Sequence, residues 1–341
     1  MKMPRTPPRD TPPPERIAAV LNAVHGPTTR GVYHHWDKLI RLNPPANLTH
    51  EEWWWALKAY RTPLQKAIPL QDKSGRYFTY AIVDPMPERL HHVDQGAGGF
   101  IGMPEQITNP ETRDIYYVKS LIDEAITSSQ LEGAVSTREV AKEMIRSGRK
   151  PRDNSEQMIL NNFRTMKRLR RLRDEPLTPE LLLEIHRVVT DETLEDPTAA
   201  GRLRTADEAV VVDDHYGEVF HEPPPAHELD RRVQAMCDFA NGTSPDHFIH
   251  PIVRSIVLHF WLGYDHPFVD GNGRTARALF YWSMLRQKYW LFEYVSISQI
   301  ILQGPAKYGR AFLHTETDDN DLTYFILYHL EVVRRAMAEL H

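Results

Sequence analysis

The fold of this chain is decided by one run of twelve residues, His266-Pro267-Phe268-Val269-Asp270-Gly271-Asn272-Gly273-Arg274-Thr275-Ala276-Arg277. Before this run, apolar residues recur with a helical period over 251–265, and after it the segment 275–288 is typical of a second helix. The run therefore joins two predicted helices through a glycine-rich loop.

The loop has the composition of an anion-binding site. Gly271 and Gly273 allow positive φ, so that successive backbone N–H groups can turn toward one bound anion. The N-terminus of the second helix adds the positive end of its dipole. Arg274 and Arg277 are spaced i, i+3, which places both guanidinium groups on one face of that helix. The pattern predicts a phosphate cradle.

Two further residues in the run extend the prediction from binding to chemistry. The imidazole of His266, with an ordinary pKa of ~6.5, suits a general base at neutral pH. The carboxylate of Asp270 beside a phosphate site suits Mg²⁺, which prefers one or two carboxylates plus phosphate oxygens. Taken alone, the histidine could be a helix cap and Asp-Gly-Asn-Gly a turn. Their combination with two arginines favours a nucleotide triphosphate site.

At these positions the chain resembles the Fic (Fido) family, whose signature is His-x-Phe-x-Asp/Glu-Gly-Asn-Gly-Arg-x-x-Arg. The resemblance implies transfer of AMP from ATP to a Tyr, Thr or Ser hydroxyl of a target protein, with release of pyrophosphate. It implies that His266 is the catalytic base and that Asp270 holds Mg²⁺. The remaining signature positions are implied to bind the nucleotide: Phe268, Gly271, Asn272, Gly273, Arg274 and Arg277.

A second motif lies upstream, in a segment with the apolar spacing of an amphipathic helix. Ser128 and Glu132 fall on one face of its last turn, and Gly133 is a typical helix stop. A glutamate at such a position is ordinarily a solvated charge. By the family resemblance, however, this segment is an inhibitory helix in which Glu132 pairs with Arg277 and occupies the place of the γ phosphate.

A predicted strand pair interrupts the helical pattern. The runs Ala209-Val210-Val211-Val212 and Val219-Phe220-His221 flank a turn-forming segment that contains Asp214 and His215. From the residues alone this is a hairpin of open function. The resemblance implies that 209–221 is a flap, which holds a target segment by β-addition while its hydroxyl approaches His266.

These features predict a mainly α fold: a Fic-type helical bundle with a β-hairpin flap, preceded by a smaller, mostly helical domain with a short β element. Capping boxes at Ser136 and Asp153, and Thr178 before Pro179, support further helices. The predicted division is a disordered or polyproline II tail over 1–15, an N-terminal domain over 16–108, and a catalytic domain over 109–341 with the inhibitory helix at 113–133.

The role of the N-terminal domain is not predicted by the sequence. Three consecutive tryptophans, Trp53, Trp54 and Trp55, cannot all face one core on a helix, because neighbouring residues are ~100° apart. We expect these side chains either to pack against the catalytic domain or to contact another subunit, so a homodimer stays an open alternative.

The composition gives no support to several other classes of protein, such as nucleic-acid-binding or membrane proteins. With 41 Lys+Arg against 46 Asp+Glu, the net charge of −5 does not favour nucleic acid or an anionic membrane as partner. The basic segment 167–173 fits the solvated face of a helix. No apolar run has the length of a membrane span, and one cysteine precludes an internal disulfide. A cytoplasmic location is expected.

Three functions fit the sequence. The first is an autoinhibited protein adenylyltransferase, with self-modification as one outcome. The second is an enzyme that removes AMP, with Glu132 orienting water, or that uses another nucleotide-bearing donor. The third is a nucleotide-sensing module without enzymatic activity. The sequence names neither the target protein nor the modified residue.

Overall fold

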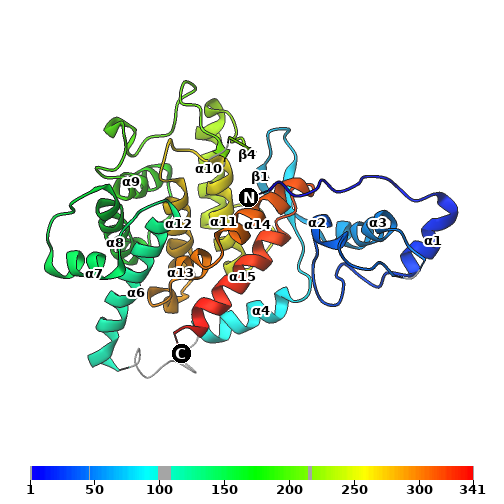
Figure 1. The fold of residues 1–341 in the computed structure, drawn as a ribbon, viewed down its shortest axis with the longest axis horizontal. Helices are drawn as coiled ribbons and strands as arrows, with labels where there is room; N and C mark the ends of the chain where they lie inside the picture. Colours follow the sequence, from blue (N-terminus) through cyan, green and yellow to red (C-terminus); the bar gives the residue numbers. More distant parts are fainter. Residues whose placement is uncertain (1, 46, 99–108, 214–216, 341) are drawn as a thin grey trace. The chain divides into compact units, whose positions relative to one another are not determined.

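The computed structural model describes residues 2–45, 47–98, 109–213 and 217–340 (Figure 1). The described chain is mainly helical, with two short antiparallel strand pairs, which confirms the predicted fold class. It divides into two compact units. Unit 1 contains Met1–His91 and Ala306–Leu330, and unit 2 contains His92–Pro305 and Glu331–His341.

Unit 1 combines helices with one strand pair. Its elements, with those that continue into unit 2, are α1 (Pro14–Asn22), α2 (Trp36–Leu39), α3 (His50–Arg61), η1 (Thr62–Leu64), β1 (Lys66–Gln71), β2 (Tyr77–Tyr80), α4 (Met86–Val93), α14 (Pro305–Thr317) and α15 (Thr323–Ala338). The short element η2 (Asp94–Gly98) lies in unit 2. Helix α1 begins at Pro14, inside the segment that the sequence assigned to the tail. Residues 2–13 have no helix or strand, and Pro4 and Pro12 are buried.

The segment that enters unit 1 from the C-terminal part of the chain is joined to strand β2. The backbone N–H of Thr79 donates to Asn320 O at 3.1 Å, and Leu322 N–H donates to Thr79 O at 2.8 Å. The sequence placed this segment in the 109–341 domain, because no local pattern reveals a partner so far away in the chain. The predicted boundary at residue 108 lies outside the described residues.

The tryptophans of α3 pack within unit 1. Trp53 and Trp54 are buried together with Val20 and Leu39, and Trp55 is partly buried against the same cluster. Thr49 closes a capping box with Glu52 and so starts the helix on this face. The three indoles therefore share one apolar cluster in their own unit.

Unit 2 holds the helical bundle. Its elements are α6 (Pro110–Leu131), α7 (Arg138–Ser147), α8 (Asn154–Leu172), α9 (Pro179–Val189), η3 (Pro197–Ala199), β3 (Val212–Asp213), β4 (Val219–His221), η4 (Ala226–Glu228), α10 (Leu229–Asn241), α11 (Pro251–Asp265), α12 (Asn272–Arg286), η5 (Trp290–Glu293) and α13 (Ile297–Leu302). Helix α12 packs against α6, α8, α9 and α11. The two helices around the signature run are thus the centre of the unit.

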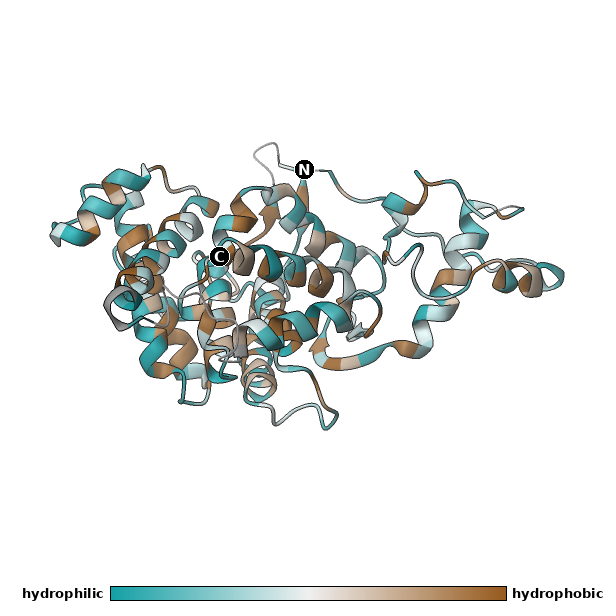
Figure 2. Cartoon of the chain, turned by 90° about the horizontal axis from the view of Figure 1, so that it is seen from below, coloured by the Kyte–Doolittle hydropathy of each residue, from teal (hydrophilic) through white to brown (hydrophobic). Residues whose placement is uncertain are grey.

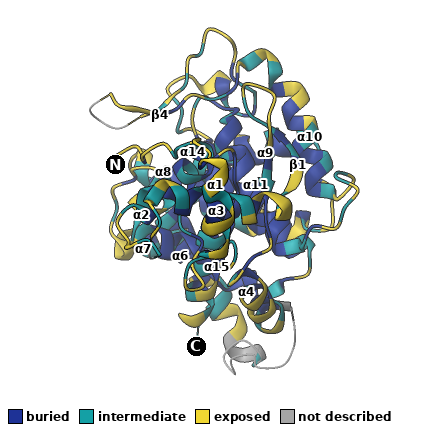
Figure 3. Ribbon diagram, turned by 90° about the vertical axis from the view of Figure 1, so that its right-hand side faces the viewer, coloured by how far each residue is buried: buried dark blue, intermediate teal, exposed yellow. Residues whose placement is uncertain are grey.

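The burial of these helices follows from their sequence. Helix α11 is apolar on nearly all sides and is buried over almost its whole length (Figure 3). Helix α9 instead buries a mainly apolar face, with Leu181, Leu182, Ile185 and Val189, and several helices show alternating brown and teal in Figure 2. Such amphipathic helices cover the apolar centre.

Helix boundaries test the predicted caps. Asp153 and Thr178 cap α8 and α9 as expected. The cap of α7 is Thr137, whose side chain accepts from Val140 N, so the prediction of Ser136 was one residue off. Helix α12 starts at Asn272 instead of Thr275, because Gly271 supplies the left-handed residue that precedes it. The first turn of α12 therefore lies inside the glycine loop.

The hairpin is shorter than predicted. Strand β3 covers only Val212–Asp213, while β4 matches the predicted 219–221; Val212 pairs with His221, and Asp213 with Val219. The predicted turn residues Asp214 and His215 lie outside the described residues. Among the described helices, none is both long and apolar enough to cross a membrane.

Candidate active site

The loop between α11 and α12 is fixed by its own side chains. His266 caps α11 in a left-handed conformation (φ 44°, ψ 56°) and donates its N–H to Leu262 O at 2.9 Å. The Asn272 side chain binds both backbone groups of Phe268: its Oδ1 accepts from N–H at 3.0 Å, and its Nδ2 donates to O at 2.8 Å. These bonds close the loop into a rigid turn.

A buried histidine that the sequence did not single out supports the loop from α9. The His186 ring stacks on Phe268, with centroids 3.6 Å apart and planes 5° from parallel. Its Nδ1 accepts from Gly201 N at 3.0 Å, so Nε2 carries the proton and donates to Asp270 O at 2.9 Å. Burial lowers the pKa of His186 to about 4, which keeps the ring neutral.

We expect His186→Phe to destabilise the protein by about 2–4 kcal/mol while keeping the ring stack, because Gly201 N–H and Asp270 O lose their buried partner. The measurement is the midpoint of thermal unfolding. His227→Phe, at an exposed histidine, is the matched control and should leave the midpoint unchanged. An unchanged midpoint for His186→Phe would contradict this role.

Gly271 is required by both conformation and space. Its φ is 81°, and a Cβ there would lie 2.5 Å from Thr190 Cγ2. Any side chain would be strained and would also collide with α9. The positive φ and the short approach to Thr190 are the physical reasons why position 271 requires glycine.

His266 has the geometry of a neutral base. Its Nδ1 lies 3.1 Å from Gly263 O, and its carbonyl accepts from Arg204 Nε at 2.9 Å. Burial lowers the pKa of His266 to about 4. With Nδ1–H donated to Gly263, the lone pair of Nε2 is free to accept a proton at pH 7.

Arg274 and Asp270 differ sharply in exposure. The Arg274 side chain is buried, and Nη1 donates to Val189 O at 3.1 Å; among the described residues, its Nε has no hydrogen-bond partner. The Asp270 side chain is 59 % exposed and lies 3.7 Å from Arg274 Nη2. A buried guanidinium with an unpartnered donor is suited to an anionic ligand.

Arg277 is held by Ser128 and Glu132. Its Nε donates to Ser128 Oγ at 2.8 Å, and its Nη2 donates to Ser128 O at 3.0 Å and to Glu132 Oε1 at 2.7 Å. Burial acts to raise the pKa of the Glu132 carboxyl, but the charges of Arg277 and Arg274 outweigh it and lower the pKa. Glu132 is therefore a carboxylate at neutral pH.

The Glu132 carboxylate rests directly on the first turn of α12. A Cβ at Gly273 would lie 2.1 Å from Glu132 Oε1, so only glycine leaves room for it. Helix α6 ends at Leu131, and Gly133, with φ 88°, follows the glutamate. The carboxylate thus occupies the helix N-terminus at which the sequence predicts phosphate binding.

The hairpin is attached beside the loop between α11 and α12. His221 of β4 binds Tyr264 O at 2.7 Å through Nε2, and Arg204 N–H donates to Pro267 O at 2.9 Å. The side chains of Val211 and Val219 are exposed. All predicted site residues outside the hairpin, from α6 and from the α11–α12 loop, lie around the start of α12.

Comparison with known proteins agrees with this geometry. The model of the Fic/DOC family matches residues 176–284, and the protein adenylyltransferase Fic of Nematostella vectensis is 27 % identical over 216 residues. This part of the chain is similar to the Fic/DOC family. The matched range contains the loop between α11 and α12 and also His186, whereas α6 and Glu132 lie outside it.

Other relatives match a shorter part of this chain. Protein adenylyltransferase fic-1 of Caenorhabditis elegans is 35 % identical over 108 residues, 32 % of this chain and 19 % of fic-1. The match to the Nematostella protein covers 63 % of this chain and 46 % of that protein. The chain thus spans less than half the length of these relatives.

Solved structures show the same fold. A Fic family protein from Desulfovibrio desulfuricans G20 superposes with a TM-score of 0.62 at 22 % identity, covering 76 % of this chain and 74 % of that one. A Fic domain containing signaling protein from Bacteroides thetaiotaomicron VPI-5482 gives a TM-score of 0.58 at 16 % identity, over 74 % of this chain and 95 % of that one. The helical bundle is therefore a Fic fold.

Proposed function

We propose that this protein is a protein adenylyltransferase, which transfers AMP from ATP to a Tyr, Thr or Ser hydroxyl and is inhibited by its own Glu132. The observation that carries the proposal is the pair between Arg277 and Glu132 at the N-terminus of α12, 2.7 Å long, where a carboxylate fills an anion site. Relatives named protein adenylyltransferase support the reaction.

The residues present fit ATP and Mg²⁺. Arg274 offers a buried, unpartnered donor, and Asp270 offers an exposed carboxylate beside it. Within the described ranges, no three His, Cys, Asp or Glu side chains gather as a metal site, so Asp270 would hold Mg²⁺ together with phosphate oxygens and water. Mg²⁺ bound there would neutralise charge on the phosphates.

His266 would act on the incoming hydroxyl. The hydroxyl oxygen bonds to the α phosphorus of ATP, the bond from that phosphorus to the bridging oxygen breaks, and pyrophosphate leaves. The proton of the hydroxyl goes to Nε2 of His266, which is neutral at pH 7. No covalent enzyme intermediate is needed, because positioning and charge neutralisation carry most of such a transfer.

The hairpin would hold the target. Strands β3 and β4 lie beside the catalytic loop through His221, and Val219 of β4 is exposed. A target segment could extend this strand pair by backbone hydrogen bonds, which would bring its hydroxyl toward His266.

The position of the transferred label tests this function. The purified protein is incubated with Mg²⁺, a cell lysate and ATP labelled either in the α or in the γ phosphate. Adenylyl transfer should label protein from α-labelled ATP only. Label from the γ phosphate would indicate a kinase reaction, and no label from either donor, also in Glu132→Gly protein, would contradict the proposal.

The pKa of His266 predicts the pH dependence of transfer. Because a base works in its neutral form, activity is lost as pH falls through its pKa, and burial moves that loss from about 6.5 to about 4. The initial rate of Glu132→Gly protein should therefore hold from about pH 7.5 to about 5.5, where an ordinary imidazole would lose roughly nine tenths. Removing Glu132 also removes a charge that raises this pKa.

Initial rates with α-labelled ATP across this range are the measurement, and circular dichroism at each pH controls for unfolding. A half-maximal rate near pH 6.5 in folded protein would contradict the prediction that burial lowers the pKa of the catalytic base.

A further inference from the structure

Glu124 is a buried carboxylate on α6, two turns before the more exposed Glu132. Its side chain accepts hydrogen bonds from Tyr281 OH at 2.8 Å, from Ser296 Oγ at 2.8 Å, and from both the backbone N–H and the hydroxyl of Ser298. Tyr281 lies on α12, and the serines lie at the N-terminus of α13. Glu124 thus ties α6 to two other helices, and we refer to these four residues as the Glu124 clamp.

Stability alone does not explain why a carboxylate lies in the clamp. Glu124 is only 2 % exposed, and among the described residues its partners are neutral donors, with no cation within ion-pair distance. A buried charge held by neutral groups is commonly no more stabilising than an apolar side chain of the same volume. The best-attested use of such groups is to fix the register of packed helices.

The register of α6 on α12 is regular. The helices run antiparallel, with Glu124 against Tyr281, Ser128 against Arg277, and Glu132 against Gly273. Each step is four residues on both helices, or about 6 Å along the axis. A clamp fixed at one end of this series therefore determines where Glu132 lies at the other.

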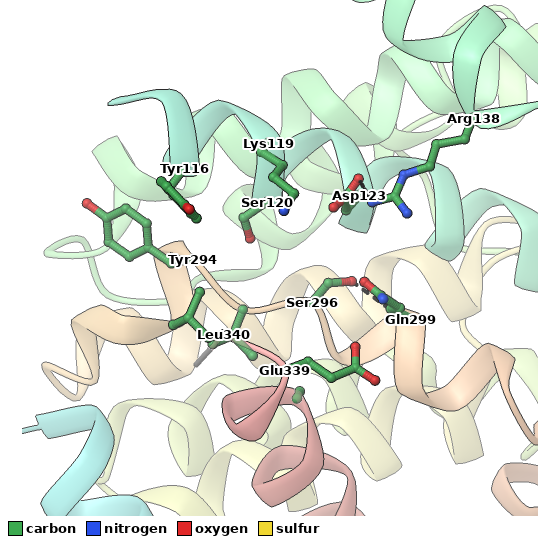
Figure 4. A pocket seen from close by; sticks show the side chains of 12 residues that line it. Tyr116, Lys119, Ser120, Asp123, Arg138, Tyr294, Ser296, Gln299, Glu339 and Leu340 are labelled. Carbon is green, nitrogen blue, oxygen red and sulfur yellow. Dashed lines mark hydrogen bonds and ion pairs between the residues drawn. The ribbon is translucent and has the colours of Figure 1, made fainter. Parts of the chain in front are cut away.

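On one side of α6, a pocket lies next to the clamp in place of apolar packing. Ser296 lines a pocket of about 220 Å³, which Ser120 and Asp123 of α6 also line (Figure 4). Asp123 in this pocket pairs with Arg138 of α7 instead of α12 or α13. Polar contacts, and Glu124 foremost, therefore resist a shift of α6 along α12 at this edge.

We propose that Glu124 is a positioning residue that holds the inhibitory helix in the register in which Glu132 binds Arg277. The inference rests on the proposed function, since it concerns how the same site is inhibited. Without the clamp, α6 can shift or tilt, and Arg277 becomes free for the nucleotide in a larger fraction of molecules.

The test compares Glu124→Gln and Ser298→Ala, each made with and without Glu132→Gly, in the full chain. With Glu132 present, both variants should raise the rate of AMP labelling from α-labelled ATP about 5- to 20-fold. With Glu132→Gly, neither should raise it further, because there is no inhibitory contact left to misplace. Affinity for a fluorescent ATP analogue should increase in parallel and does not depend on transfer.

Asp123→Asn is the matched control, because it makes the same chemical change at the neighbouring buried carboxylate, which faces Arg138. It should leave the rate and the ATP affinity unchanged. Ser298→Ala removes one hydroxyl donor and leaves Glu124 in place, so if Glu124→Gln fails to fold, Ser298→Ala should still fold and be activated.

Several results would overturn the positioning role. If the clamp variants activate the protein equally with and without Glu132, or if Asp123→Asn activates it as much as they do, the cause is a general loosening of the fold. Folded clamp variants with wild-type rate and ATP affinity, beside an activated Glu132→Gly protein, would refute the clamp alone. A Glu132→Gly protein without activation and without tighter ATP binding would refute the inhibition itself, and the clamp with it.

Discussion

Glu132→Gly protein should transfer AMP on the order of 10- to 100-fold faster than the wild type, because the variant removes the group that competes with ATP for Arg277. In the wild type, Arg277 is buried and its Nη2 binds Glu132 Oε1 at 2.7 Å. The same carboxylate lies on Gly273 at the start of α12. A nucleotide must displace it before its phosphates can use that helix end.

The rate of AMP labelling with α-labelled ATP is the measurement, with lysate proteins and the chain itself as acceptors. Ser128→Ala is a graded control. It removes one hydrogen bond to Arg277 and leaves the carboxylate in place, so it should activate less than about 5-fold. A Glu132→Gly protein that is folded but no faster than wild type would contradict the inhibitory role.

The removal of AMP is a second reaction that would also make label accumulate in Glu132→Gly protein. The two explanations differ in what wild-type protein does to a labelled acceptor. If Glu132 inhibits transfer, wild-type protein added to the labelled acceptor leaves the label in place. If Glu132 instead orients water for removal of AMP, the added wild-type protein releases AMP from the acceptor.

The sequence predicted those parts of the site that depend on neighbours in the chain. Helix α11 has the predicted bounds. The loop that follows it is held by hydrogen bonds between its own residues, as between Asn272 and Phe268. Such features follow from residues within one or two turns of each other.

The supporting residues were missed because their partners are far away in the sequence. His186 binds a backbone oxygen 84 residues later, and Glu124 binds a hydroxyl 157 residues later. Each of them, taken in its own helix, is an ordinary side chain on a buried face. The pairing of Glu132 with Arg277 spans a similar distance, and it was predicted only through the family resemblance.

His266→Ala, made together with Glu132→Gly, should reduce AMP transfer by about 10²- to 10⁴-fold, the usual contribution of a positioned base. The removal of Glu132 is necessary here, because a loss from an already inhibited rate is hard to measure. ATP affinity should stay unchanged, since the groups proposed to bind the phosphates, Arg274 and Arg277, are retained.

The conformation of His266 calls for a second variant. With φ at 44°, alanine at this position is strained, whereas asparagine tolerates the left-handed region. If only His266→Ala loses transfer, the cause is a disturbed loop. If His266→Asn loses transfer to the same extent, the cause is the missing base. If both variants bind the fluorescent ATP analogue normally and still transfer AMP at the rate of Glu132→Gly, the proton must leave by another route. His266 would then serve only as the cap of α11.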